Sequence, residues 1–360
     1  MKPGDIVEVE IHDIAFGGDG VARHEGRVIF IPYAAPQEQL KVRITRVKKD
    51  YAHGEIAELI RSGAGRCEPK CRYYRVCGGC QYQHLDYETQ LAIKEKQLRD
   101  VLGRIGGIQN PNILHFLKSP QPYGYRNRIS VHQEDERVGF RGCDGRSLVE
   151  VEECVIASVE VNRKLRYLRS HPGRREHYSL REDEIPREGF YQTNRFLLDP
   201  LRELVALQIT AGAPLVIECY GGAGFFTPGI SKKAERVILV ESDAKLAQEA
   251  RGIAAQNVEV REAECEEVLP EFLHLPELKD AEIVVDPPRE GLSPGMRKLL
   301  AGLPARKLVY LSCNPSTLAR DLKEIAPQWN PLQFQPVDLF PQTAHFECLA
   351  VCERSEQAAQ

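Results

Sequence analysis

The stretch "PLVIECYGGAGFF", residues 214–226, decides the fold. Its first half is a short apolar run, which predicts a buried strand, and a glycine-rich turn follows directly. A second apolar run, "RVILVES" at 236–242, is followed by "DAKLAQEARGIAAQN", which predicts a helix capped by Asp243. Strands that alternate with helices form a parallel sheet covered by helices, so we predict an α/β fold.

The same alternation continues toward the carboxyl terminus. "VEVREA", "AEIVVDPP" and "KLVYLSC" predict three further strands, and "PSTLARDLKEIA" predicts a helix after the last of them. "LQFQPVDLF" and "HFECLAVCER" predict a closing pair of strands on the edge of the sheet. This domain is expected to cover residues 189–360.

The glycine-rich turn predicts a ligand site. Gly221, Gly222 and Gly224 let backbone approach a ligand, and Glu241 at the tip of the second strand can bind two ribose hydroxyls. A dinucleotide site would carry a further glycine at position 227, where this chain has Thr227. The pattern therefore favours S-adenosylmethionine (SAM) over NAD.

Two smaller regions precede this domain. Residues 1–62 contain short β-rich runs cut by turn signals, which predict a small β-barrel. Residues 63–188 hold a cysteine-rich segment, a helix opened by Asp86 and closed by glycines, and strands between residues 123 and 154. The charged stretch from residue 171 to 188 is interpreted as a loop or linker.

Eleven cysteines occur in a chain without an apparent export signal, so we expect reduced thiols and no disulfide framework. Three of them, Cys71, Cys77 and Cys80, lie within ten residues and flank two glycines, which is typical of a metal site. Zinc and an iron–sulfur cluster are both acceptable to such thiols. The candidates for a fourth ligand are Cys67, Cys143 and Cys154.

Composition and charge narrow the class of protein. The 360 residues carry a net charge of −4, and no apolar run is long enough to span a bilayer. We therefore expect a cytoplasmic protein with no membrane partner, and the sequence indicates no protein partner. Basic residues cluster at 41–49, 61–75 and 163–181, which fits either RNA binding or ordinary solvated faces.

Three further side chains are expected near the ligand edge of the sheet. Cys313 ends the strand "KLVYLSC", Asp286 follows the strand before it, and Glu347 ends the motif "LFPQTAHFE". Cys313 and Asp286 each have a plain structural alternative, since free cysteine is often a buried hydrophobe and aspartate often caps a turn.

Together these motifs resemble the iron–sulfur RNA uracil-5-methyltransferases of the RumA/TrmA family over nearly the whole chain. The resemblance implies a class I (Rossmann-like) SAM-dependent methyltransferase domain, an OB-like TRAM barrel that binds RNA, and a small iron–sulfur central region. It implies a nucleophile at Cys313 in "SCNPSTLARD" and a base at Glu347 in "FPQTAHFE". It also implies a [4Fe–4S] cluster on the four positions Cys71, Cys77, Cys80 and Cys154, and SAM contacts at Gln192, Tyr220, Gly222, Gly224, Glu241, Glu264 and Asp286.

The implied activity is SAM-dependent methylation of C5 of a uridine in RNA. A thiolate that adds to C6 makes C5 nucleophilic, and a base then removes the C5 proton. The expected RNA is 23S rRNA, with tRNA as the alternative, and a catalytically silent RNA-binding scaffold is an alternative of another class. The chain departs from the family at Glu218, at Gly221 and in its short segment between Cys154 and Phe190.

Overall fold

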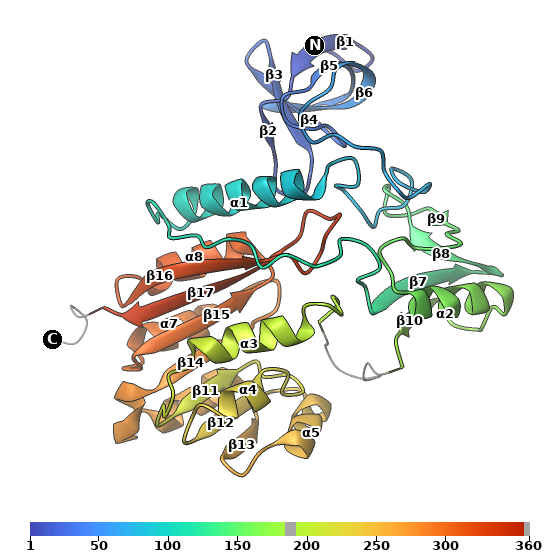
Figure 1. Cartoon of the computed structure of the whole chain (residues 1–360). Helices are drawn as coiled ribbons and strands as arrows, with labels where there is room; N and C mark the ends of the chain where they lie inside the picture. The colour runs from blue at the N-terminus through green and yellow to red at the C-terminus, as the bar shows by residue number, and fades with distance from the viewer. Residues whose placement is uncertain (184–191, 356–360) are drawn as a thin grey trace. The chain divides into compact units, whose positions relative to one another are not determined.

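The computed structural model describes residues 1–183 and 192–355 (Figure 1). The chain forms two compact units, each assembled from separate segments. The first unit contains residues 1–97, 120–183 and 340–345; the second, within the described residues, contains 98–119, 192–339 and 346–355. The predicted domain ranges 1–62, 63–188 and 189–360 stay predictions.

The amino-terminal part of the first unit is a six-stranded sheet in the order β1-β5-β6-β4-β3-β2. Its strands are β1 (Ile6–Glu10), β2 (Asp13–Ile14), β3 (Gly20–His24), β4 (Arg27–Ile31), β5 (Gln39–Val47) and β6 (Tyr51–Arg61). Alternate residues of these strands, such as Ile29, Ile31, Leu40 and Val42, are fully buried. Burial of each of these side chains stabilises the folded state by about 1.5–3 kcal/mol. The prediction of a β-rich amino-terminal module is confirmed.

A second sheet of the first unit has the order β10-β7-β8-β9. Its strands are β7 (Arg128–Glu134), β8 (Arg137–Arg141), β9 (Leu148–Val149) and β10 (His177–Arg181), and α2 (Val159–Ser170) packs on it through Val161, Leu165 and Leu168. The prediction of a loop from 171 to 188 is wrong for β10, which pairs with β7 in antiparallel register. Tyr178 and Leu180 pack against the apolar cluster, and this alternation is hidden by the charged neighbours; residues 184–188 lie outside the described residues.

The second unit is built on a seven-stranded sheet in the order β13-β12-β11-β14-β15-β17-β16. Its strands are β11 (Val216–Cys219), β12 (Val237–Glu241), β13 (Val258–Glu262), β14 (Glu282–Val285), β15 (Lys307–Ser312), β16 (Trp329–Val337) and β17 (Glu347–Arg354). The first five are parallel; at one edge β17 pairs antiparallel with β15, and β16 pairs antiparallel with β17. The predicted parallel sheet with a closing pair of strands is confirmed.

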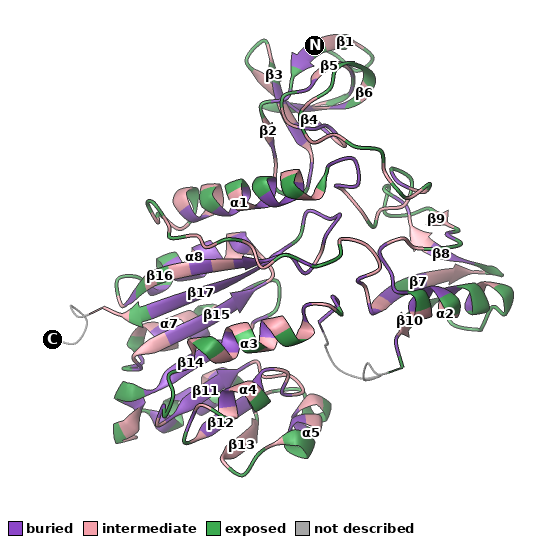
Figure 2. Ribbon diagram, viewed as in Figure 1, coloured by how far each residue is buried: buried purple, intermediate pink, exposed green. Residues whose placement is uncertain are grey.

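Helices pack around this sheet, whose central strands β11, β12, β14, β15 and β17 are buried over most of their length, while the edge strands β13 and β16 are less buried (Figure 2). They are α1 (Tyr87–Arg104), α3 (Leu198–Gln208), α4 (Thr227–Ser231), α5 (Ala244–Ile253), α6 (Cys265–Val268), α7 (Pro294–Gly302) and α8 (Pro315–Ile325), with short 3₁₀ turns at Leu269–Phe272 and Pro276–Asp280. Asp86, Asp243 and Asn314 accept hydrogen bonds from the first backbone amides of α1, α5 and α8, which is why those helices begin there. In the described part of the chain, no helix is both long and apolar enough to cross a membrane.

Candidate active site

The candidate site lies at the carboxyl edge of the parallel strands in the second unit. Cys219 of β11 pairs in register with Val240 of β12 and Val285 of β14, and Val285 pairs with Tyr310 of β15. Residues that directly follow these strands therefore share one edge of the sheet, where open α/β sheets bind ligands.

Cys313 and Glu347 face each other across two neighbouring strands. Ser312 of β15 pairs with Cys348 of β17 in antiparallel register, so the next position along each strand brings Cys313 opposite Glu347. Glu347 is buried and Cys313 is half-buried. Burial, and to a smaller extent the nearby Glu347 carboxylate, raise the pKa of the Cys313 thiol to about 12. The structure thus brings the predicted nucleophile and base together.

Asp286 and Arg289 approach the same pair. Burial raises the pKa of Asp286 to about 7. Burial also raises the pKa of Glu347 well above its ordinary value, an effect that Asp286 strengthens and the Arg289 guanidinium opposes. Arg289 likewise opposes the rise in the pKa of Cys313. A cation beside a thiol favours its thiolate, so Arg289 is a functional candidate that the sequence interpretation missed.

Glu241 is held at the tip of β12 by backbone amides. The Gly222 amide donates to Glu241 Oε2 at 2.8 Å, and the Asp243 amide donates to Oε1 at 2.8 Å. Gly222 and Gly224 adopt positive φ angles of +56° and +82°, which glycine tolerates best. The predicted glycine turn and carboxylate therefore meet. Glycine is needed at position 221 for a different reason: an added Cβ there would lie 2.4 Å from the Leu239 side chain.

The remaining predicted SAM contacts fall on nearby segments. Burial raises the pKa of the Tyr220 hydroxyl, and Glu264, which precedes α6, contributes to that rise and so lies close to it. Gln192 is buried two residues before Asn194, whose amide donates to Ser119 Oγ at 3.0 Å. The position of Gln192 relative to Cys313 stays a prediction, and Phe190 and Tyr191 of its motif lie outside the described residues.

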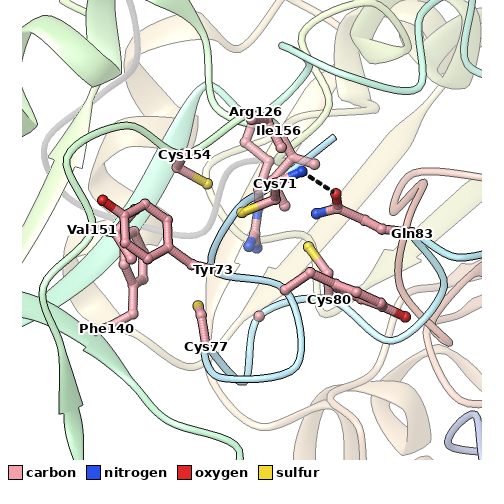
Figure 3. A pocket seen from close by; sticks show the side chains of 13 residues that line it. Cys71, Tyr73, Cys77, Cys80, Gln83, Arg126, Phe140, Val151, Cys154 and Ile156 are labelled. Carbon is pink, nitrogen blue, oxygen red and sulfur yellow. Dashed lines mark hydrogen bonds between the residues drawn. The ribbon is translucent and has the colours of Figure 1, made fainter. Parts of the chain in front are cut away.

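Four cysteines of the first unit line one cavity of about 50 Å³ (Figure 3). They are Cys71, Cys77, Cys80 and Cys154, and their sulfur atoms face a common space. The other two candidates lie elsewhere: Cys67 Sγ approaches the Gln83 carbonyl, and Cys143 Sγ bonds to Tyr33 at 3.0 Å. Within residues 1–183 and 192–355, no three His, Cys, Asp or Glu side chains form a group that could hold a metal ion. An iron–sulfur cluster is therefore not shown.

The loop that carries three of these cysteines depends on close backbone packing. The Gly78 amide donates to the Arg141 carbonyl at 3.0 Å, and a Cβ at Gly78 would lie 2.9 Å from the Gly142 carbonyl oxygen. Only glycine fits this approach without a shift of the backbone. The Cys71 amide donates to Gln83 Oε1 at 3.1 Å, which fixes the start of the loop.

Comparison with known proteins identifies the class of this site. Residues 173–355 match the family described as tRNA (uracil-5-)-methyltransferase, and residues 1–57 match the TRAM domain. An uncharacterized RNA methyltransferase of Bdellovibrio bacteriovorus is 31% identical over 96% of this chain and 95% of the relative. The chain belongs to the tRNA (uracil-5-)-methyltransferase family. The predicted RumA/TrmA family and the predicted class of enzyme, a SAM-dependent RNA (uracil-C5)-methyltransferase, are confirmed.

Two other relatives bear on length and fold. An uncharacterized RNA methyltransferase of Halalkalibacterium halodurans is 28% identical over 98% of both chains, but its alignment spans 454 positions, so that relative contains segments this 360-residue methyltransferase lacks. The crystal structure of the Pyrococcus abyssi tRNA (uracil-54, C5)-methyltransferase, in complex with S-adenosyl-L-homocysteine, matches the fold with a TM-score of 0.73. It is 23% identical and covers 96% of this chain and 100% of the other.

Glu218 is a buried carboxyl group of β11, just before the glycine-rich turn. Thr227 Oγ1 donates to Glu218 Oε2 at 2.7 Å, while Oε1 has no hydrogen-bond partner among the described residues. Burial raises the pKa of Glu218 to about 8, and Asp286 adds to this rise. The carboxyl group of Glu218, where the chain departs from the family, therefore lies buried with one of its two oxygens unpaired among the described residues.

The raised pKa of Glu218 predicts a stability that falls with pH. A carboxyl group whose pKa is higher in the folded state contributes stability below its unfolded pKa and loses it as the pH rises toward about 8. Glu218→Gln should flatten the curve of unfolding free energy against pH by up to about 1.4 kcal/mol per pH unit. Urea unfolding between about pH 5 and pH 8 measures this. Glu203→Gln, on the exposed face of α3, is the control, and parallel curves for Glu218→Gln and wild type would refute the prediction.

Asp321 of α8 anchors the loop that carries Arg289. Its Oδ2 accepts from the Leu292 amide at 2.8 Å and from the Tyr310 hydroxyl at 2.7 Å. Its Oδ1 accepts from Arg320 Nη2 at 2.7 Å and from Arg297 Nη1 at 3.2 Å. A fully buried carboxylate thus ties the loop to β15, α7 and α8.

Asp321→Ala should destabilise the protein by about 3–5 kcal/mol, because it leaves buried donors and an arginine without their acceptor. Chemical denaturation measures the change in unfolding free energy. Asp280→Ala, at an exposed aspartate of the same unit, should change it little. Equal stability of the two variants would show that water replaces the Asp321 contacts.

Proposed function

We propose that this methyltransferase transfers the methyl group of SAM to C5 of a uridine in RNA through a covalent intermediate on Cys313. The observation that carries the proposal is the register of β15 and β17, which sets Cys313 opposite Glu347 at the ligand edge of the sheet. Asp286 and Arg289 flank this pair.

The steps follow from the chemistry of uracil. The Cys313 thiolate adds to C6, and the electron pair of the C5–C6 bond passes into an enolate. C5 then attacks the methyl carbon of SAM, and the sulfur of SAM takes the electron pair of the broken bond. Glu347 removes the C5 proton, the C5–C6 double bond re-forms, and the thiolate leaves. The raised pKa of Glu347 makes its carboxylate a stronger base, while Arg289 favours the ionised forms of both groups.

SAM is proposed to bind over the glycine turn beside this edge. Glu241, already aligned by two backbone amides, would accept hydrogen bonds from the ribose hydroxyls, and Gly222, where an added Cβ would meet nothing within 4 Å, leaves the backbone open to the ligand. Further contacts are proposed for Tyr220, Glu264, Asp286 and Gln192.

The RNA is proposed to be 23S rRNA, as the resemblance to the RumA/TrmA family implies. A tRNA is the second candidate, because the Pyrococcus abyssi structure that shares this fold over 96% of the chain is a tRNA methyltransferase. Mass spectrometry of nucleosides, with position mapping, from cells with and without the gene tests the proposal. Loss of one 5-methyluridine from rRNA supports the first candidate, and loss from tRNA supports the second. No change in either RNA would favour a catalytically silent RNA-binding scaffold.

A [4Fe–4S] cluster is proposed as a structural clamp on Cys71, Cys77, Cys80 and Cys154. Two features support the fit: the four thiols face one cavity, of about 50 Å³, and they join two segments, the 71–80 loop and the segment at Cys154. The apolar side chains of Phe140, Val151 and Ile156 line the same cavity and limit access of water. When bound, the cluster would supply a covalent cross-link between the cysteine loop and the segment at Cys154.

Cys154→Ser should lower the iron content and the visible absorbance of anaerobically purified protein to a small fraction of wild type. The reason is that it removes the one thiol that joins the cavity from outside the 71–80 loop. Cys143→Ser is the matched control, because Cys143 is close in space yet does not line the cavity. Equal iron loss in both variants would count against the assignment of Cys154.

A further inference from the structure

A second cavity, of about 180 Å³, lies in the first compact unit and is not used by the proposed reaction. It is lined by Pro32 and Tyr33 after β4, Glu55 and Ile56 of β6, and Arg75 of the cysteine loop. Residues of the TRAM sheet and of the cysteine loop therefore build one pocket, although they are far apart in the sequence.

The cavity combines two flat surfaces. The Arg75 guanidinium carbon lies 5.5 Å from the centroid of the Tyr33 ring, within the range of a cation–π contact. The Tyr33 ring is itself fixed, because it packs edge-on against Tyr74 at 5.3 Å and its hydroxyl bonds to Cys143 Sγ at 3.0 Å. Tyr33 thus holds the guanidinium of Arg75, an exposed residue, at the wall of the cavity.

The backbone at both residues is held in an uncommon conformation. Tyr33 has φ of +63° and Arg75 has φ of +71°, a region that bulky residues avoid unless the surroundings impose it. At Tyr33 the cause is visible: its carbonyl accepts from Arg66 Nη2 at 2.8 Å, and Arg66 also binds the buried carboxylate of Glu38. The walls of the cavity are therefore set before any ligand binds.

Charge around the cavity suits a nucleic acid. Arg75 is exposed, and within the described residues no carboxylate lies at salt-bridge distance from it. Arg43 pairs with Glu55 at 3.4 Å and Lys41 of the same strand pairs with Glu58 at 2.8 Å, so both are balanced by carboxylates and Arg75 supplies the positive charge of the pocket lining. Glu55 contributes a hydrogen-bond acceptor to the pocket wall.

We propose that this cavity binds one unstacked base of the RNA, distinct from the target uridine, by stacking on the Arg75 guanidinium plane. Bases stack readily on aromatic and guanidinium planes, and a carboxylate accepts from an exocyclic amino group. Uracil can offer the carboxylate only its ring N3–H, whereas adenine, cytosine and guanine carry an exocyclic amino group, so the pocket is expected to prefer one of those bases to uracil. The inference rests on the proposed function for the identity of the ligand as RNA.

Binding of short fluorescent single-stranded RNA oligomers to the full-length, cluster-loaded protein tests this inference. Wild type should prefer oligo(A) or oligo(C) over oligo(U). Arg75→Lys, which keeps the charge but loses the plane, should weaken binding of the preferred oligomer about tenfold without a change in its salt dependence. Glu55→Gln should reduce the preference over oligo(U). Arg72→Lys, in the same loop but paired with Glu152, is the control and should bind as wild type does.

The outcomes separate this inference from the proposed function. If Arg75→Lys and Glu55→Gln both bind every oligomer as tightly as wild type, the cavity does not bind a base of the RNA, even when the enzyme forms 5-methyluridine. If wild type discriminates between oligomers and Arg75→Lys does not, binding of a base in the cavity is supported. This conclusion would stand even if no uridine were methylated. The absence of methylation would refute only the proposed function.

Discussion

Replacement of Cys313 by alanine should abolish formation of 5-methyluridine while binding of RNA persists. Without the thiolate, C6 receives no nucleophile and C5 never gains the negative charge that attacks the methyl group. The rate should fall by roughly 10⁴-fold or more, as it does when a covalent nucleophile is removed. Transfer of labelled methyl from SAM to RNA measures the rate, and a denaturing gel detects the covalent complex.

The control for Cys313→Ala is Cys352→Ala, which removes a thiol from the buried interior of β17, away from the ligand edge. Cys352→Ala should lower the free energy of unfolding but leave methyl transfer measurable. Cys313→Ser tests the same step with a weaker nucleophile and should also form no detectable adduct. If Cys313→Ala methylated RNA at the rate of wild type, the covalent mechanism would be ruled out.

The parallel sheet could be predicted because its strands are buried on both faces. "VIEC", "VILVE" and "KLVYLS" are almost continuously apolar, and such runs separated by helical segments leave few alternatives to an α/β sheet. The position of Cys313 at the ligand edge followed from the end of its strand. That Cys313 lies opposite Glu347 depends on the register of β15 and β17, which only the fold defines.

Other parts of the structure could not be predicted from local pattern. β10 is stabilised by pairing with β7, a contact across more than forty residues, while its own charged neighbours indicate a loop. The cysteine spacing predicted three converging thiols. It did not distinguish Cys67, Cys143 and Cys154 as candidates for the fourth ligand. Only tertiary packing sets Cys154 on the cavity.

Arg289 and Asp321 were missed for a related reason. A basic residue three positions after Asp286 is an ordinary feature of a turn, and nothing local shows that it approaches Cys313 and Glu347. Asp321 ends a motif on an amphipathic helix, where a charged residue usually faces solvent. Its burial arises because Arg297, Arg320, Tyr310 and the Leu292 amide converge on it.

Glu347→Gln should trap the methylated RNA on the enzyme. The glutamine side chain has nearly the same size but cannot accept the C5 proton, so methyl transfer proceeds once and the thiolate cannot leave. Release of product should fall by about 10²–10⁴-fold, the range that a general base contributes. A denaturing gel should show a covalent complex that carries the methyl label and contains Cys313, in contrast to Cys313→Ala, which forms none.

The control for this trap is Glu353→Gln, an exposed glutamate on the same strand, which should release product as wild type does. Comparison of Cys313→Ala with Glu347→Gln also shows the order of the reaction steps. If Cys313→Ala forms no adduct and Glu347→Gln accumulates a methylated one, addition precedes methyl transfer and proton removal follows it. An adduct without the methyl label would instead place Glu347 before methyl transfer, and free 5-methyluridine RNA at the normal rate would exclude it as the base.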